Sequence, residues 1–503
     1  MPYLNNSTID PSNMRHHLNR SPLVWLTMLL PLLQLGSCAT NPVTGKSDYV
    51  LMSEGQEIAL GQRYNQEILK EMPAYADPEL AQLVQSVGKK LAAHSHRTGL
   101  NYRFTIVDSP TVNAFALPGG YIYITRGMLA YLNSEAELAA VLGHEIGHVT
   151  SRHSVRQHSA STTVNVIGAV ISVASGVPGT DDLTSMAGTA IVRGYGREHE
   201  LEADRLGAQY MARSGYDPDA MLEVIGILKD QETFEKRRAR EEGREANVYH
   251  GLFSSHPRND TRLQEVVRAA RRHRTGTATR VNHDGYIRAL DGLTFGDSES
   301  QGIIRGNRIY HKELDFTLAF PTGWQIDNRP DQVAAIPASE DGLMQLEMTE
   351  LGKTLSPRNV LVKKLGLDDL RRGEKITADG MQGYTGIANS KTTFGIRPVR
   401  YIVLLRSKTA FIIAGTAKDK RNPWKYDRQI IATAKTLRGM TAKDEKAGSP
   451  RRIRVISAGS NSRYRQLAGQ SPIQHYAEDQ LRLLNDQYPK GEPHKGQLLK
   501  IVR

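Results

Sequence analysis

The pentapeptide His144-Glu145-Ile146-Gly147-His148 constrains this chain more than any other feature of its sequence. Positions four apart on an α-helix lie on one face, one turn above each other, so His144 and His148 can both direct a ring nitrogen at one Zn²⁺. Glu145 then lies beside the metal without binding it. Its carboxylate can accept a proton from zinc-bound water, whose pKa falls to about 7, and pass that proton to a leaving amine. The pattern therefore predicts a helix with a zinc site suited to peptide-bond hydrolysis.

The residues before this pentapeptide predict the start of its helix. Ser134 and Glu137 have the spacing of a capping box, in which each side chain satisfies a backbone N–H group of the first turn. The run from Glu135 to Gly143 contains Ala, Leu, Val and Glu and no proline. We therefore expect a largely apolar helix that carries the two histidines at its end.

A zinc site needs a third protein ligand, and the residues directly after the pentapeptide do not supply the metzincin pattern. That pattern requires Gly at position 151 and His at position 154, where this chain has Ser151 and Ser154. The metzincin class is therefore disfavoured, and His153 remains a near neighbour only.

A better source of the third ligand lies in residues 197–204, within a stretch predicted to be helical through Met211. Glu200 and Asp204 are four apart and share one face of this helix. One of them can bind the metal while the other holds a ligand histidine by its second ring nitrogen. Alone, such a helix is more often a solvated face of paired charges, but the upstream histidine pair makes that interpretation the less favoured one.

Four motifs in order resemble metallopeptidase family 48, the gluzincins that include CAAX prenyl proteases and HtpX-like proteases. The pentapeptide and the following Ser-Arg-His form the first, and the E-x-x-A-D helix of residues 200–204 forms the second. A segment upstream, Asn113 to Ile122, looks like the family's active-site edge strand. Ser255-His256-Pro257 with Arg262 looks like its late histidine motif. The resemblance is to the periplasmic lipoprotein branch of the family.

This resemblance implies roles for individual residues. His144, His148 and Glu200 are the implied zinc ligands, Glu145 the general base, and Asp204 the partner of a ligand histidine. His256 is implied either to bind the zinc in a resting state or to help stabilise the oxyanion. The alternative for His256 is a histidine at the start of a helix before a proline.

The upstream segment predicts how a substrate binds. The residues assigned to the substrate edge strand are Asn113, Ala114, Phe115 and Ala116, and Tyr121 to Arg126 alternate as an edge strand does. An extended polypeptide can add to such an edge through main-chain hydrogen bonds. Because this recognition reads the backbone more than the side chains, we expect a broad preference for unfolded or extended segments.

The N-terminus predicts export and lipidation. Arg15 and Arg20 precede a short apolar run, Leu23 to Leu35, which is shorter than the roughly 20 residues of a transmembrane span. The run ends in Leu-Gly-Ser-Cys, and Cys38 is the only cysteine of the chain. Residues 1–37 therefore resemble a signal peptide with a lipobox, cleaved before a lipidated Cys38, and the alternative is a free cysteine at the end of an ordinary signal. Ala39 favours outer-membrane sorting, so we expect a periplasm-facing envelope lipoprotein.

Composition restricts the class of protein. A length of 503 residues predicts about three to four domains, and a hydrophobic content of 39% with a mean hydropathy of −0.44 argues against a polytopic membrane protein. Thr162 to Gly176 is apolar but interrupted, which favours a packed or mobile helix that could cover the site. The net charge of +12 comes from scattered basic residues without stacking aromatics. This pattern argues against nucleic acid and favours an anionic lipid, lipopolysaccharide or cell-wall polymer as the opposite charge.

These observations predict an α+β multidomain chain. A mainly helical gluzincin domain with a small active-site sheet is expected over residues 39–275, and a linker over 276–310. Short alternating runs and a closing helix, Trp424 to Leu437, predict an α+β domain with an antiparallel sheet over 311–440, similar to the PsbP/Mog-type fold. Residues 452–503 resemble a degenerate LysM module, a type that binds peptidoglycan, with Ser460-Asn461 in place of the usual Asp-Thr. A small β-α unit that only packs on its neighbour is the equal alternative.

The function favoured by this sequence is a zinc endopeptidase, with one Zn²⁺ per chain, that acts on unfolded or misassembled envelope proteins. Two alternatives stay open. One is a chaperone-like binder that holds its clients, and the other is a cell-wall-binding lipoprotein. In both, the protease cleft would be latent, covered by His256 or by residues 162–176.

Overall fold

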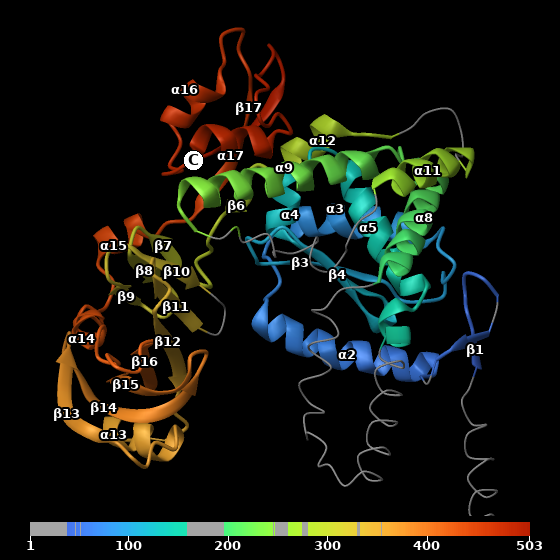
Figure 1. Cartoon of the computed structure of the whole chain (residues 1–503). Coiled ribbons are helices and arrows are strands. Elements are labelled where there is room, and N and C mark those ends of the chain that lie inside the picture. The colour runs from blue at the N-terminus through green and yellow to red at the C-terminus, as the bar shows by residue number, and fades with distance from the viewer. Residues whose placement is uncertain are drawn as a thin grey trace, which may run out of the picture.

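The computed structural model describes residues 38–45, 47–50, 52–157, 196–244, 246, 260–273, 280–328, 332–353 and 355–503. Along the chain these form an N-terminal part up to residue 273, a sheet part from 303 to 447 and a C-terminal part from 451 to 503 (Figure 1). The α+β multidomain class predicted from the sequence is confirmed. The predicted signal peptide, the segment 162–176 and His256 lie outside the described residues.

The N-terminal part is mainly helical. Its elements are β1 (Cys38–Thr40), β2 (Ser47–Tyr49), α2 (Glu54–Glu71), α3 (Pro78–Ala92), β3 (Arg103–Val107), β4 (Ala114–Leu117), β5 (Tyr121–Thr125), α4 (Arg126–Tyr131), α5 (Glu135–Thr150), α8 (Arg197–Arg213), α9 (Ala220–Glu241) and α11 (Asp260–Ala270). Short 3₁₀ turns, η2 (Pro118–Gly120) and η3 (Arg271–His273), complete it. Helix α5 packs against α3, α8 and α9, so the helix with the two histidines lies at the centre of this part.

The small sheet of this part has the order β3-β5-β4. β5 pairs in parallel with β3 and antiparallel with β4, and all five of its residues are buried. The prediction that Tyr121 to Arg126 is an edge strand is therefore wrong: the alternation of its side chains reflects two buried faces. β4, the strand of Ala114 to Leu117, has a partner on only one side among the described residues and is an edge.

The sheet part contains one sheet of seven antiparallel strands in the order β10-β11-β12-β16-β15-β14-β13. These strands are β10 (Trp324–Asn328), β11 (Gln332–Pro337), β12 (Gly342–Glu350), β13 (Arg371–Ala378), β14 (Met381–Thr392), β15 (Gly395–Arg406) and β16 (Thr409–Ala417). A smaller antiparallel sheet precedes it, with β7 (Ile303–Arg305), β8 (Arg308–His311) and β9 (Phe316–Ala319). The helices are α13 (Pro357–Asn359), η4 (Val360–Lys364), α14 (Asp427–Lys435) and α15 (Ala442–Ala447).

Both faces of the seven-stranded sheet are covered. Alternate residues of a strand point to opposite faces, and in β15 Ile402 and Leu404 pack with α14 while Val403 packs with η4. The predicted closing helix over Trp424 to Leu437 corresponds to α14, and the predicted antiparallel α+β architecture is confirmed. A sheet covered on both faces has its own two hydrophobic cores and does not need the N-terminal part to bury them.

The C-terminal part behaves differently, because it shares a core with the N-terminal part. It consists of β17 (Arg451–Ser457), α16 (Tyr464–Gly469), α17 (Ala477–Leu484) and β18 (Leu498–Val502). Its apolar residues, including Leu481 and Leu499, belong to the same buried cluster as Leu138 of α5. Figure 1 shows α17 lying along α9.

The chain between the N-terminal part and the sheet part also joins this core. Within the predicted linker 276–310, the described residues form α12 (His283–Ala289) and β6 (Thr294–Phe295), and Tyr286 and Leu290 are fully buried in the shared cluster. β6 pairs with β17, which pairs with β18. The sheet part is therefore inserted between two adjacent strands of one small sheet.

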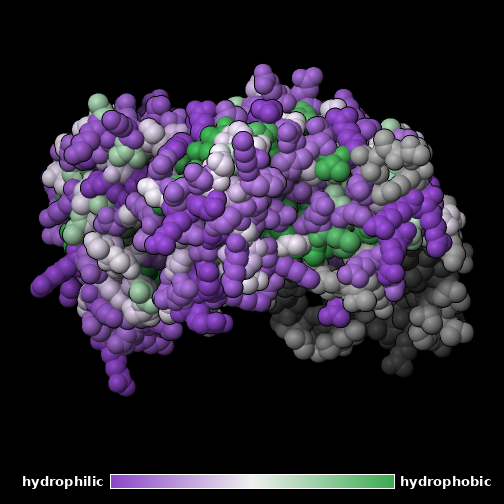
Figure 2. Space-filling model, turned by 90° about the horizontal axis from the view of Figure 1, so that it is seen from above, coloured by the Kyte–Doolittle hydropathy of each residue, from purple (hydrophilic) through white to green (hydrophobic). Residues whose placement is uncertain are grey.

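The face of the molecule that is seen from above is mostly hydrophilic where it is coloured (Figure 2). Seen from above, apolar residues gather only in small patches (Figure 2). None of the helices within the described residues combines the length and the apolar character that crossing a membrane requires.

Candidate metal centre

Helix α5 begins where the sequence predicts. The Ser134 side chain caps it by accepting a hydrogen bond from the backbone N–H of Glu137 at 3.1 Å. The Glu137 carboxylate accepts from the backbone N–H of Asn133 at 2.7 Å. In a closed capping box it would accept from the backbone N–H of Ser134 instead. The helix runs from Glu135 to Thr150 and carries both histidines of the pentapeptide in its last two turns.

Glycines allow α5 and α8 to touch along their backbones. A Cβ atom placed on Gly147 would lie 2.7 Å from the carbonyl oxygen of Ala203, and one on Gly207 would lie 2.9 Å from the backbone nitrogen of His144. Real Cβ atoms do not approach backbone atoms so closely, so any larger residue at these positions would push the helices apart. This contact brings the first turn of α8, with Glu200, to the histidine pair on α5.

The structure brings His144, His148 and Glu200 together. The two Nε2 atoms lie 3.0 Å apart, and each lies 3.6 Å from a carboxylate oxygen of Glu200. A tetrahedral zinc ion with ligand bonds of about 2.0–2.1 Å requires donor atoms about 3.3 Å apart. The three donor atoms therefore have the chemistry and the spacing of a three-ligand zinc site, and all three side chains are shielded from solvent.

Each histidine of the pair is held by its other ring nitrogen. His144 Nδ1 lies 2.8 Å from Asp204 Oδ1, and His148 Nδ1 lies 2.8 Å from Nδ1 of His153. His153 Nε2 in turn lies 3.1 Å from a carboxylate oxygen of Glu202. With protons on His144 Nδ1, His148 Nδ1 and His153 Nε2, every one of these bonds has a donor and an acceptor. This arrangement leaves the Nε2 lone pairs of both α5 histidines facing Glu200.

The electrostatics of the site favour positive charge, either a proton on His144 Nε2 or a metal ion that takes its place. Burial opposes the charged form of His144, but the hydrogen bond and charge of Asp204, with the charges of Glu200 and Glu145, outweigh it and raise its pKa to about 9. Burial lowers the pKa of His153 to about 4, which keeps its Nδ1 an acceptor at neutral pH. The site therefore attracts positive charge. Glu145 lies between the two histidines in sequence and is completely buried.

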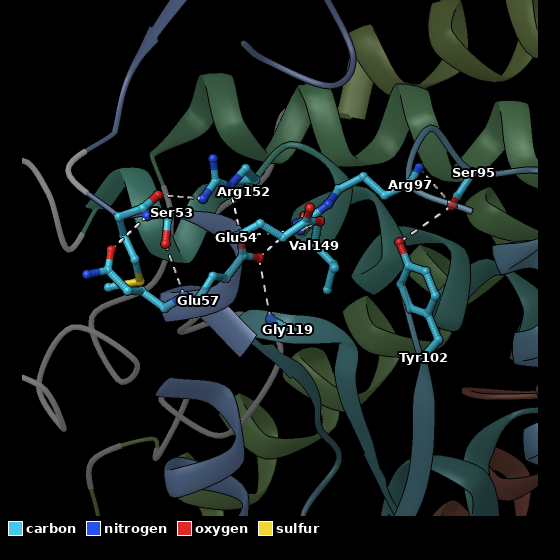
Figure 3. A network of polar contacts seen from close by, with 11 residues as sticks. Ser53, Glu54, Glu57, Ser95, Arg97, Tyr102, Gly119, Val149 and Arg152 are labelled. Carbon is cyan, nitrogen blue, oxygen red and sulfur yellow. Dashed lines mark hydrogen bonds and ion pairs between the residues drawn. The ribbon is translucent and has the colours of Figure 1, made fainter. Parts of the chain in front are cut away.

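A second polar network supports the C-terminal end of α5 (Figure 3). Glu57 of α2, which is 1% exposed, accepts hydrogen bonds from Arg97 Nη1 and Arg152 Nε, both at 2.8 Å. Arg97 Nη1 also donates to the carbonyl oxygen of Val149, in the last turn of α5, at 3.1 Å. Two guanidinium groups thus share one buried carboxylate, and together they connect α2 to the end of the helix that carries His148.

Other residues singled out from the sequence lie elsewhere. Ala114 to Ala116 lie on the edge strand β4, which packs against α5, and Asn113 directly precedes it. Cys38 lies in β1 at the start of the described chain. The late histidine, His256, falls outside the described residues.

Sequence reasoning missed two groups of supporting residues. His153 was identified only as a near neighbour: it follows the end of α5 at Thr150, and the left-handed backbone of Arg152 (φ 55°) precedes it, so helical spacing does not indicate its contact with His148. The Glu57 network joins residues 40 and 95 positions apart, and no local spacing pattern indicates such a contact.

Comparison with known proteins finds similarity to peptidases in the N-terminal part. Residues 78–270 match the family model described as Peptidase family M48. The beta-barrel assembly-enhancing protease of Escherichia coli strain K12 is 35% identical over 210 residues, which cover 40% of this chain and 43% of that protein. The mitochondrial metalloendopeptidase OMA1 of Arabidopsis thaliana is 36% identical over 144 residues, 28% of this chain and 29% of that protein. The chain thus spans less than half the length of these relatives.

A comparison with solved structures gives only a weak likeness. The cyanobacterial PsbP protein of Synechocystis has 13% sequence identity and a TM-score of 0.22, over 28% of this chain and 94% of that protein. This likeness is too weak to carry an argument, so the PsbP/Mog-type fold stays a prediction.

Proposed function

We propose that this chain, whose residues 78–270 form a peptidase family M48 domain, is a zinc-dependent endopeptidase that cleaves unfolded or misassembled envelope proteins. The observation that carries the proposal is the spacing of 3.0–3.6 Å between the donor atoms of His144, His148 and Glu200. The metalloendopeptidase relatives support the reaction class.

His144, His148 and Glu200 are the residues that would hold the zinc ion, with Asp204 and His153 fixing the two rings. Bound there, zinc supplies Lewis-acid chemistry, which polarises a carbonyl group and acidifies water. A catalytic zinc site keeps one position open beyond its three protein ligands, and three ligands are what these helices provide.

Glu145 is the proposed general base. It lies next to the metal ligand His144 on α5 and is completely buried. Its carboxylate takes a proton from the attacking water and delivers it to the leaving amine of the substrate. His256 is the proposed stabiliser of the oxyanion or resting-state ligand, on the sequence resemblance alone.

The proposed substrate-binding element is β4. It pairs with β5 on one side and packs against α5, the helix of the site. An extended segment of substrate can add to the other edge through backbone hydrogen bonds, which places no demand on its sequence. Folded proteins rarely offer such a segment, so unfolded chains are the proposed substrates.

The location of the protein is proposed from its N-terminus. Lipidation of Cys38 would tether the chain to a membrane, and Ala39 favours the outer membrane on the periplasmic side. The printed name of the bacterial relatives, beta-barrel assembly-enhancing protease, supports a role in the envelope. Binding of peptidoglycan by residues 452–503 is a further proposal that rests on the LysM-like sequence pattern.

Cleavage of casein, an unfolded protein, and of a stably folded protein by the chain that begins at residue 39 tests this proposal. We expect casein alone to be cut, and Glu145→Gln to abolish cleavage while leaving the zinc content unchanged. Equal resistance of both proteins would contradict the proposed substrate class. Full complementation in cells by a Glu145→Gln variant that does not cleave casein would instead favour the holding role of a chaperone-like binder.

A further inference from the structure

A polar cavity lies where the three parts of the chain meet, away from the candidate metal centre. It has a volume of about 250 Å³ and is lined by residues of the N-terminal part, of β6 and the chain after it, of β7 in the sheet part and of the C-terminal part. Because a water molecule occupies about 30 Å³, the cavity has room for a small ion with several waters. Its charged lining residues are Arg126, Asp297, Arg305 and Arg451.

Arg126 is built into the wall of this cavity. It is 1% exposed, its Nε donates to Asp108 Oδ1 at 2.5 Å, and its Nη1 donates to the carbonyl oxygen of Thr294 at 3.1 Å. Its Nη2 is buried and has no hydrogen-bond partner within the described part of the chain. A buried N–H group of a guanidinium is costly to leave without an acceptor.

Arg305 ends β7, the first strand of the sheet part, and Arg451 begins β17, the first strand of the C-terminal part. Arg305 Nη2 donates to the carbonyl oxygen of Ser449 at 2.8 Å, so the first strand of the sheet part lies beside the chain that leads to β17. The Nε of Arg451 is buried and lacks a hydrogen-bond partner among the described residues. Burial lowers the pKa of both arginines, and the charge of Arg451 lowers that of Arg305 further.

The cavity therefore has an excess of positive charge. Within the described part of the chain, Asp297 is the only carboxylate that lines the cavity, and its Oδ2 already accepts from the backbone N–H of Ile304 at 2.9 Å. Neither Arg305 nor Arg451 forms an ion pair with a carboxylate of the described chain. Guanidinium groups that approach from three separate elements suit a tetrahedral oxyanion, which offers acceptors in more directions than a planar carboxylate does.

We propose that this cavity binds a phosphate-type oxyanion, which joins Arg126 of the N-terminal part to Arg305 of the sheet part and Arg451 of the C-terminal part. The bound oxyanion fixes the orientation of the inserted sheet part relative to the M48 domain. The phosphate belongs either to free inorganic phosphate or to the headgroup of an anionic lipid. This site is independent of peptide hydrolysis.

Calorimetric titration of the chain from residue 39 with inorganic phosphate, against sodium chloride of equal ionic strength, tests the site. We expect saturable binding of phosphate that weakens at least about tenfold in Arg451→Gln and in Arg305→Gln, since each loses charge-assisted hydrogen bonds. Asp297→Asn should tighten binding because it removes the opposing carboxylate. Arg454→Gln is the matched control, since Arg454 is exposed on the same strand as Arg451 and faces Asp291.

Two further readouts decide the source and the consequence of binding. In a parallel titration, vesicles containing phosphatidylglycerol replace free phosphate. If binding depends on Arg451 with the vesicles but not with free phosphate, the oxyanion is assigned to a lipid headgroup. Hydrogen exchange of residues 296–305 and 447–451 should slow with the bound oxyanion in the unmodified chain and not in Arg451→Gln. Identical behaviour in phosphate, chloride and vesicles would overturn the proposal and leave a cavity that holds water. Equal losses of phosphate affinity in Arg451→Gln and Arg454→Gln would overturn the proposal as well.

Discussion

Asp204 holds the ring of His144 through a single hydrogen bond of 2.8 Å, and this bond decides which nitrogen faces the candidate metal centre. Asp204→Asn keeps the size of the side chain but offers an amide that can turn a donor toward the ring. We expect zinc affinity to fall by about 10–100-fold, the usual effect of removing such a partner. Competition with a chelating dye measures the affinity. Glu198→Gln, an exposed change in the first turn of the same helix, is the control, and equal affinity in both variants would contradict this role.

His311 makes the sheet part sensitive to acid. It is 6% exposed, stacks on Phe316, and its burial lowers its pKa to about 4. The unfolded chain takes up a proton near pH 6.5, while the folded chain resists protonation until about pH 4, so stability falls as the pH falls through this window. The loss amounts to about 3 kcal/mol at pH 4.

Urea unfolding of His311→Gln between pH 7 and pH 4 measures this contribution. We expect the variant to lose less stability over this range than the unmodified chain, because glutamine does not titrate. His283→Gln changes an exposed histidine and should leave the pH dependence as it is. Parallel curves for His311→Gln and the unmodified chain would refute this role of His311.

At the residue scale, sequence reasoning worked where ligands follow helical spacing. His144 and His148, and then Glu200 and Asp204, are each four apart, and the structure brings the two pairs together. It failed where a contact has no fixed spacing. Glu57 reaches Arg152 across 95 positions, and only the packing of α2 against the rest of the fold creates that contact.

At the scale of elements, the crossing of α5 and α8 sets the geometry of the site. A methyl group on Gly207 would lie 2.9 Å from the backbone of Gly143 and His144, so Gly207→Ala must separate the helices. We expect a loss of about 1–3 kcal/mol in stability, the usual cost of overpacking. Zinc affinity should also fall, because Glu200 moves away from the histidines.

Gly226→Ala is the matched control for this change. Gly226 lies inside α9, and a Cβ atom there would meet no other atom within 4 Å. This variant should be neutral or more stable by up to about 1 kcal/mol, since alanine favours helix more than glycine does. Thermal unfolding and dye competition on both variants measure the effects. Unchanged zinc affinity in Gly207→Ala would show that the close contact does not set the site.

Element predictions succeeded where a pattern has one structural meaning. The helix before the pentapeptide begins at the predicted cap, and alternating runs of the sheet part became β9, β12, β15 and β16. The strand Tyr121–Thr125 was misplaced at an edge, because aromatic and aliphatic side chains alternate equally well in a central strand with two buried faces.

At the scale of the whole molecule, the C-terminal part completes the core of the N-terminal part. Lys500 of β18 is fully buried, and its Nζ donates to the carbonyl oxygens of Ala130 and Leu132 at 2.8 and 2.7 Å. Burial lowers the pKa of Lys500 and raises that of the nearby Glu137 at the start of α5. The last strand of the chain thus supports the loop that leads into the metal-binding helix.

Lys500→Met tests this support. It leaves both carbonyl oxygens without their donor, so we expect a loss of about 1–3 kcal/mol in stability. Because the two parts share one core, we expect them to unfold together. Near-ultraviolet circular dichroism should therefore show a single unfolding transition, at lower stability than in the unmodified chain. Lys495→Met changes an exposed lysine and should have little effect. A separate early transition of the C-terminal part would show that the two parts fold independently.

The insertion of the sheet part could not be predicted from the sequence. β6 and β17 are neighbours in one sheet, yet their paired residues Phe295 and Arg451 are 156 positions apart. Periodicity describes each strand by itself and not its distant partner. For this reason the sequence predicted a linker and a terminal module as separate units, whereas α12 and β6 pack in the core that the C-terminal part completes.

The central claim is that His144, His148 and Glu200 hold one catalytic zinc ion, and metal content measured together with casein cleavage on one preparation tests it most directly. We predict one zinc per chain, loss of cleavage when a chelator removes the metal, and recovery of cleavage when zinc is restored. His148→Ala should lack both zinc and activity. Cleavage that persists in the chelated protein, or in a His148→Ala variant free of metal, would contradict the account.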